Sequence, residues 1–165
     1  MKNLIFCTNM KQPKTIPECN CKSFSSNFEF QHDNRMIVSF KDKGHSTEYR
    51  CMNHSVNHLA KYRIDGGLIP DNNAKCDFLL LNCEQKQSYF IELKGSDIVR
   101  AIEQIDRSID ILKDELLDFA FFARIVLSRV NTIDLKNIKL LKLEKKVKSL
   151  KGDLKKQSRL LEEAI

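Results

Sequence analysis

The sequence predicts an α/β fold: a single domain in which helices pack against one mixed sheet. Two apolar runs, 76–81 and 89–93, lie close together in the chain and have the composition of neighbouring buried strands. An apolar stripe at helical spacing follows between 98 and 116. A third apolar run, 119–130, is aromatic and β-branched and favours another buried strand. With 165 residues, the chain is long enough to bury one sizeable core.

Residues 1–44 are predicted to form an N-terminal extension that carries a strand pair. The stretch 1–27 is rich in Lys, Pro, Ser, Asn and Cys, which favours irregular structure. The short apolar runs FEFQ and RMIVSF follow, separated by HDN, which suits a turn. We therefore expect two short strands before the core of the domain.

Residues 45–130 are predicted to form that core. Its first element is a short amphipathic helix within 46–59, where apolar residues recur at helical spacing: Tyr49, Met52, Val56 and Leu59. Turn signals at 65–67 and 70–73 flank a short expected strand at 68–69. The two central strands come next, joined by the polar loop NCEQKQS.

Two further helices complete the prediction. Ser96 is placed to cap the first, whose apolar stripe consists of Ile98, Ile102, Ile105, Ile109, Leu112 and Leu116. After the strand within 119–130, residues 131–165 are predicted to form a basic helical segment with a helix that ends near Gly152. Its apolar residues recur at three and four positions: Leu140, Leu143, Val147, Leu150 and Leu154.

The composition, 42% hydrophobic and 30% charged, is typical of a soluble globular protein. No run reaches ~18 apolar residues, the length of a transmembrane helix, and the first apolar run is too short for a secretory signal. We therefore expect a cytoplasmic protein with no membrane partner. In that compartment the six cysteines are expected to be free thiols or metal ligands, with Cys76 and Cys83 as small core residues.

The net charge of +6 is concentrated in one segment. Residues 135–165 hold ten basic and four acidic residues, whereas the first 134 residues hold eighteen of each. Lysines along a helix commonly form a solvated surface. A surface that contacts the phosphates of a nucleic acid is the functional alternative.

Three ionisable residues interrupt the two central apolar runs. Among five acid-x-Lys pairs in the chain, only Glu92 and Lys94 lie at the end of an apolar strand. Alternate residues of a strand share one face, so these two side chains project together, away from Ile91 and Leu93. If the central strands pair as an antiparallel hairpin, Asp77 at the start of one meets them at the end of the other.

Two carboxylates at one edge of a sheet form a hard oxygen site suited to Mg²⁺ or Mn²⁺. Lys94 would then hold or deprotonate a metal-bound water and balance charge on a phosphate. The structural alternative is an ion pair in which Lys94 neutralises Asp77 or Glu92.

The run CDFLLL, followed by YFIELKG and a helix carrying AIEQI, resembles the PD-(D/E)xK nuclease superfamily over about 45–130. Cys76 stands where that motif often has proline. The resemblance implies an αβββαβ restriction-endonuclease-like core and metal-dependent phosphodiester hydrolysis. It also implies that Asp77 and Glu92 bind the metal with the carbonyl of Leu93, and that Lys94 orients the attacking water.

The resemblance also points to supporting residues. In some branches a glutamine on the next helix supports the site, and Gln104 fits that place; an ordinary surface glutamine is the alternative. The superfamily often has a further acid on its first helix, for which Glu48 is the candidate metal ligand. Asp65 is its rival, although RIDGG is also a turn former. Arg100 and Arg107, which share a helix face, are candidate phosphate contacts.

The residue types that bind zinc occur at Cys19-x-Cys21 and Cys51-x-x-His54, with His58 nearby, which is the candidate for a second metal site. Its spacing matches no closed zinc-finger pattern. The alternative is that these side chains bind nothing.

Three functions are compatible with these features. The first is an active Mg²⁺-dependent deoxyribonuclease of stand-alone restriction, defence or mobile-element type, which as a homodimer would cut both strands of DNA. The second is a Holliday-junction-resolvase-like or repair nuclease. The third is a non-catalytic nucleic-acid-binding or interaction subunit, against which the intact Asp–Glu–Lys set argues. No nucleotide-binding signature occurs, so an ATPase or other defence-system partner would be a separate chain.

Overall fold

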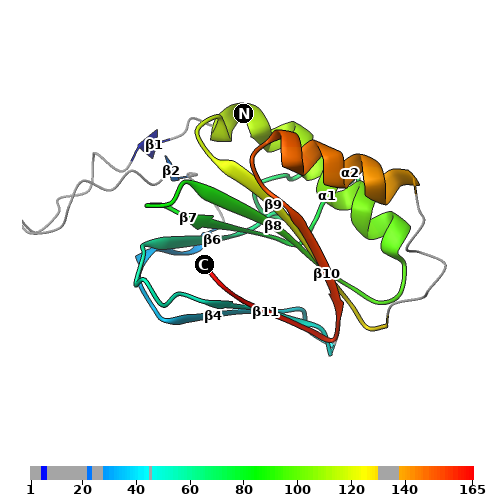
Figure 1. Cartoon of the computed structure of the whole chain (residues 1–165), viewed down its shortest axis with the longest axis horizontal. Helices are drawn as coiled ribbons and strands as arrows, with labels where there is room; N and C mark the ends of the chain where they lie inside the picture. The colour runs from blue at the N-terminus through cyan, green and yellow to red at the C-terminus, as the bar shows by residue number, and fades with distance from the viewer. Residues whose placement is uncertain (1–4, 7–21, 24–27, 45, 130–137) are drawn as a thin grey trace, which may run out of the picture.

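The computed structural model describes residues 5–6, 22–23, 28–44, 46–129 and 138–165. They form a mixed α/β structure in three layers (Figure 1). A large six-stranded sheet lies in the middle, two helices cover one of its faces, and a three-stranded sheet covers the other. A separate antiparallel pair joins β1 (Ile5–Phe6) to β2 (Lys22–Ser23).

The large sheet has the order β10-β9-β8-β7-β6-β3. Its strands are β3 (Phe28–Asp33), β6 (Leu59–Arg63), β7 (Phe78–Asn82), β8 (Gln87–Lys94), β9 (Ala120–Leu127) and β10 (Leu154–Ser158). β6, β7 and β8 form an antiparallel meander, as predicted for the two central strands. β9 runs parallel to β8, which requires a crossover connection, and the helix α1 supplies it.

The helices are α1 (Ile98–Leu112), continued by the 3₁₀ helix η2 (Lys113–Leu116), and α2 (Ile138–Ser149). The predicted apolar stripe of α1 is buried against the sheet. The cap is Asp97 rather than Ser96, since the Asp97 carboxylate accepts a hydrogen bond from the Arg100 amide at 3.0 Å. The chain leaves α2 through Lys151, whose φ is 65°, and Gly152, where an added Cβ would lie 1.7 Å from the carbonyl oxygen of Phe121. No helix among the described residues is long and apolar enough to cross a membrane.

The small sheet has the order β11-β5-β4, with β4 (Ile37–Lys41), β5 (Glu48–Met52) and β11 (Leu160–Ala164). Alternate side chains, including Phe40, Tyr49 and Leu161, point inward and pack against the large sheet. The second core cluster therefore lies between the two sheets, while the first lies between the large sheet and the helices.

A buried arginine joins the two sheets. Arg124 of β9 forms ion pairs with Glu163 of β11 and with Asp153, whose Oδ1 lies 2.5 Å from Nη1. Its guanidinium also lies over the rings of Tyr89 and Phe122, 5.4 and 5.3 Å from their centroids. The charge is thus satisfied inside the protein, as a buried ion requires.

Three elements differ from the predictions. Within 46–59 there is no helix: Glu48–Met52 is a strand, because Tyr49 and Cys51 alternate with more exposed neighbours at the period of two that suits a sheet. The N-terminal strands β3 and β4 do form, but not as a pair, since β3 joins β6 and β4 joins β5. The segment 131–165 is not wholly helical, since Leu154 begins β10 instead of extending the stripe of α2.

Two smaller predictions also change. The strand expected at 68–69 is only an isolated bridge between Asp65 and Ile69. Cys76 and Cys83 are core residues as predicted, and Cys51 and Cys76 are free thiols as predicted. Cys83 is disulfide-bonded, so the prediction of a free thiol is wrong for it.

Candidate active site

The pairing of β7 with β8 brings the three motif residues together. Phe78 pairs with Ile91, so Asp77, one residue earlier, lies across from Glu92. Phe78 and Ile91 pack between the sheets, whereas the alternate residues of both strands face α1. By this alternation Asp77, Glu92 and Lys94 share the face that α1 covers. The Asp77 Oδ2 accepts a hydrogen bond from the Leu93 amide at 2.8 Å.

Glu92 is wholly buried, with 0% of its surface exposed. Lys94 Nζ lies 3.1 Å from its Oε1 as an ion pair, yet within the described part of the chain neither carboxylate oxygen has a hydrogen-bond partner of ordinary geometry. Burial, followed by the charge of Asp77, raises the pKa of Glu92 to about 8 against the opposing effect of Lys94. Without a bound cation, this carboxyl therefore holds its proton at neutral pH for much of the time.

Asp77 is less buried than Glu92, and its carboxylate accepts a hydrogen bond from the Leu93 amide. Burial raises its pKa to about 6, while the Leu93 amide and Lys94 oppose that rise. The negative charges of Asp42 and Asp65 add to the rise. The two facing carboxyls thus repel one another and resist ionising together, a condition that a cation between them would relieve.

Lys94 lies at the boundary of the site. Its side chain is 26% exposed, so the ammonium reaches solvent while it neighbours a buried carboxylate. This geometry satisfies the ion-pair interpretation, and it also suits a group that holds a water beside the carboxylate pair.

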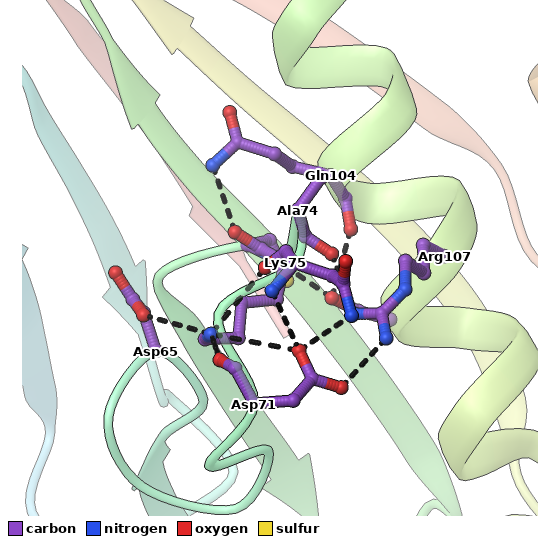
Figure 2. Close-up of polar contacts among 9 residues, drawn as sticks. Asp65, Asp71, Ala74, Lys75, Gln104 and Arg107 are labelled. Atoms are coloured by element: carbon purple, nitrogen blue, oxygen red, sulfur yellow. Dashed lines mark hydrogen bonds and ion pairs between the residues drawn. The ribbon is translucent and has the colours of Figure 1, made fainter.

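Gln104 of α1 is not a surface residue, since only 7% of it is exposed. Its Nε2 donates to the carbonyl of Lys75 at 2.8 Å, and its Oε1 has no partner among the described residues. Figure 2 shows this amide reaching from the helix to the chain that leads into β7. The glutamine therefore contacts the segment two residues before Asp77.

The two candidate extra acids lie in different surroundings. Glu48 is on β5, not on a helix, and its carboxylate is bound by Ser39 Oγ at 2.8 Å, Arg50 Nε at 3.1 Å and Lys41 Nζ at 3.2 Å. Although burial opposes them, these contacts lower the pKa of Glu48. Asp65 instead acts on Asp77 electrostatically, so of the two acids it belongs to the surroundings of the motif.

Lys75 is a buried cation that the sequence did not single out. Only 6% of its side chain is exposed, and its ammonium donates to the carbonyls of Asp71 and Asn73 and pairs with Asp65 Oδ1 at 3.3 Å (Figure 2). The turn signals at 70–73 predicted a loop there, but an isolated lysine beside them gave no reason to expect burial. The loop folds over this ammonium and satisfies it.

Comparisons with models of protein families, with curated proteins and with solved structures found no match to this chain. The proposed function therefore rests on the motif residues and on the geometry of this site.

The predicted zinc ligands do not gather within the part of the chain that is described. Cys51 is buried, and burial raises the pKa of its thiol to about 12, whereas His54 is exposed and His58 pairs with Glu84. Cys19 and Cys21 lie outside the described residues. Among those that are described, no group of three or more His, Cys, Asp or Glu side chains is arranged to hold a metal.

The predicted basic surface is partly neutralised. Lys139 pairs with Glu103 and Lys146 with Asp106, so acids on α1 compensate one side of α2. Arg107, a predicted phosphate contact, instead pairs with Asp71 at 2.7 Å. Other basic residues are exposed and make no ion pair within the described ranges: Arg100, Lys142 and Lys145.

Proposed function

We propose that this protein is a metal-dependent nuclease of the PD-(D/E)xK type that hydrolyses phosphodiester bonds in DNA. One observation carries the proposal: Glu92 is wholly buried opposite Asp77, and apart from its ion pair with Lys94 neither of its oxygens has a hydrogen-bond partner of ordinary geometry among the described residues. A buried carboxyl without such partners is costly. A divalent cation is the ligand that would satisfy this pair of acids.

The order of elements supports the proposal. β6, β7 and β8 form a meander, α1 crosses over, and β9 lies parallel to β8, which corresponds to the βββαβ part of the core that the resemblance implies. The first helix of that core has no counterpart at 46–58, where β5 and a turn occur instead. The small sheet is a further departure from the expected pattern.

Asp77 and Glu92 would hold Mg²⁺ or Mn²⁺, with the carbonyl of Leu93 as the further donor implied by the resemblance. When bound, such a cation lowers the pKa of a coordinated water and balances charge on the phosphate. Lys94 serves the same reaction from the solvent side, because its ammonium can orient the attacking water and offset negative charge. Gln104 supports Asp77 indirectly through its bond to the Lys75 carbonyl.

Two further features would serve a DNA substrate: positive charge on α2 and a second copy of the site. Exposed lysines of α2, Lys142 and Lys145, supply positive charge for a DNA backbone. A homodimer would bring two sites to the two strands of a duplex. We further propose a stand-alone restriction, defence or mobile-element enzyme, with any ATPase or defence-system partner on a separate chain.

The test is a cleavage panel with linear duplex, supercoiled plasmid, single strand, four-way junction and RNA. Each is incubated with Mg²⁺, Mn²⁺ or EDTA. Glu92→Gln and Lys94→Ala should abolish cutting while DNA binding persists. Glu162→Gln is the matched control, because among the described residues Glu162 pairs only with Arg50, in an exposed contact on the outer face of the small sheet.

The preferred substrate then separates the nuclease classes. Preference for the four-way junction would favour a resolvase over a restriction enzyme. Tight binding of DNA without cutting in any metal would contradict the proposal and favour a non-catalytic subunit. Calorimetric titration with Mn²⁺ gives a second readout, since Glu92→Gln should lose the binding that Glu162→Gln retains.

A further inference from the structure

The chain that leads into the candidate site is irregular, yet it is held firmly. Regular strand structure begins at Phe78, and the backbone of Asp77 is tied to the neighbouring chain through its carbonyl, which accepts from the Ile64 amide at 2.9 Å. On its N-terminal side, residues 70–76 have no strand structure at all. Besides its bonds to the Ile64 amide and to an amide of β8, Asp77 is thus placed by the contacts of this approach segment, which we define as residues 74–76.

Side chains of α1 bind each residue of the approach segment in turn. Arg107 Nη1 donates to the Ala74 carbonyl at 2.8 Å. Gln104 Nε2 donates to the Lys75 carbonyl, also at 2.8 Å, and the Cys76 amide donates to Ser108 Oγ at 2.9 Å. Figure 2 shows the first two of these contacts from one face of the helix.

Ser108 is suited to hold the Cys76 amide in one place. It is 0% exposed, and its hydroxyl donates to the Gln104 carbonyl at 2.8 Å. Its single proton is therefore committed within the helix, which leaves an oxygen lone pair to accept from Cys76. A buried amide that lost this acceptor would be left unsatisfied.

Arg107 holds the loop at two points. Its Nη2 lies 2.7 Å from Asp71 Oδ2 and its Nη1 lies 3.3 Å from Asp71 Oδ1, which is the fork geometry of a guanidinium on a carboxylate. The same Nη1 reaches the Ala74 carbonyl. A lysine ammonium lacks this planar array of donors and cannot make all three contacts in the same geometry.

We infer that Arg107 and Ser108 are positioning residues, which clamp the approach segment to α1 and so fix the Asp77 carboxylate opposite Glu92. For its catalytic meaning this inference rests on the proposed function. The link to the carboxylate is direct along the chain, since Asp77 follows Cys76 and accepts from the Leu93 amide. Loss of the clamp should loosen that hydrogen bond before it disturbs the centre of the sheet.

The first test reads the Leu93 amide by NMR-detected hydrogen exchange in the protein without metal or DNA. In Ser108→Ala and in Arg107→Lys, Leu93 should exchange at least about tenfold faster, while Ile91 in the centre of β8 stays as slow as in the unchanged protein. Ser149→Ala is the matched serine control, because Ser149 Oγ also donates to a helix carbonyl, that of Lys146. Arg100→Lys is the control for Arg107, since it makes the same substitution on the same helix.

The second test measures Mn²⁺ affinity by calorimetry and the cleavage rate at saturating DNA. Both clamp variants should bind Mn²⁺ about tenfold more weakly, and kcat should fall while KM for DNA is retained. If Ser108→Ala fails to fold, the comparison of Arg107→Lys with its control Arg100→Lys decides whether the inference holds. Leu93 exchange equal to that of the controls would overturn the inference. If the unchanged protein neither binds Mn²⁺ nor cuts DNA, the proposed function fails, but Leu93 exchange still decides the positioning role.

Discussion

The Asp77 carboxylate accepts a hydrogen bond from the Leu93 amide, with 2.8 Å between Oδ2 and N. This bond ties the residue before β7 to the strand that carries Glu92 and Lys94. The two carboxyls are therefore held by one strand pair in a buried setting. Protonation of these carboxyls, or a cation bound in place of the protons, should therefore control how stability and metal affinity vary with pH.

Without metal, the protein should lose stability as pH rises from 5 to about 8. Burial raises the pKa of Glu92 to about 8 from its ordinary 4.5, and that of Asp77 to about 6 from 3.8. The folded protein then keeps protons that the unfolded chain has released, so this stabilisation is present at low pH and is lost through pH 6 and 8. Below pH 5, carboxyls with a lowered pKa, such as Glu163, contribute with the opposite sign.

Urea unfolding at a series of fixed pH values measures this loss, which should be on the order of 5 kcal/mol. Glu92→Gln should flatten the profile above pH 6, because the amide does not titrate. A stability profile parallel to that of the unchanged protein would show that the pKa of Glu92 is not raised in the folded state.

Metal affinity should increase with pH between 6 and 8. A cation at this site must displace the proton of Glu92, whose pKa is about 8. The affinity should therefore rise by up to about tenfold per pH unit, with one proton released. Titration with Mn²⁺ in two buffers of different ionisation enthalpy counts the proton. An affinity independent of pH would contradict the assignment of Glu92 as a ligand.

The double variant Lys142→Glu, Lys145→Glu should bind duplex DNA more weakly. Both lysines are exposed on α2. Loss of two phosphate contacts should reduce the slope of log K against log salt by about 2. Fluorescence anisotropy over a salt series measures it, and Lys142→Arg, Lys145→Arg is the control that keeps the charge. Unchanged affinity and slope would leave this helix face as a solvated surface.

Gly152→Ala should destabilise the protein by about 2–5 kcal/mol. The new Cβ would lie 1.7 Å from the carbonyl oxygen of Phe121, so the chain between α2 and β10 would have to move. Gly95→Ala is the control, because no atom of the described residues lies within 4 Å of its Cβ position. Equal melting temperatures for the two variants would refute the steric argument.

Arg124→Leu should cost about 3–5 kcal/mol of stability, since it leaves the partly buried Glu163 without its main partner. Arg124 also holds the pKa of Glu163 below its ordinary value against the effect of burial. The double variant Arg124→Leu, Glu163→Leu should recover part of the loss. Urea unfolding of the four proteins in this cycle gives the coupling energy, and strict additivity would rule out the pair as a bridge between the sheets.

The elements that were predicted well are those with a strong local period. The stripe from Ile98 to Leu116 forms α1 and η2, and the two central apolar runs form the hairpin β7–β8. Strand alternation also predicted which face Glu92 and Lys94 would share. The stretch 46–59 failed because four apolar residues matched a helical period, whereas the strand that forms uses Tyr49 and Cys51 at a period of two.

Thus the sequence alone determined the local elements around Asp77, Glu92 and Lys94, because hydrophobic period and strand alternation act between near neighbours in the chain. Only the tertiary structure decided how distant segments meet: β3 and β4 in different sheets, and β11 beside β5. It also decided that Arg107 binds Asp71 and that Lys75 is buried beneath its loop. Lys75 binds near neighbours such as Asp71, but the turn signals there predict only a loop and not which side chain it buries. The strand pairings and the contact of Arg107 with Asp71 join residues far apart in sequence, so they depend on complementary packing of whole surfaces and leave no periodic signal in either segment.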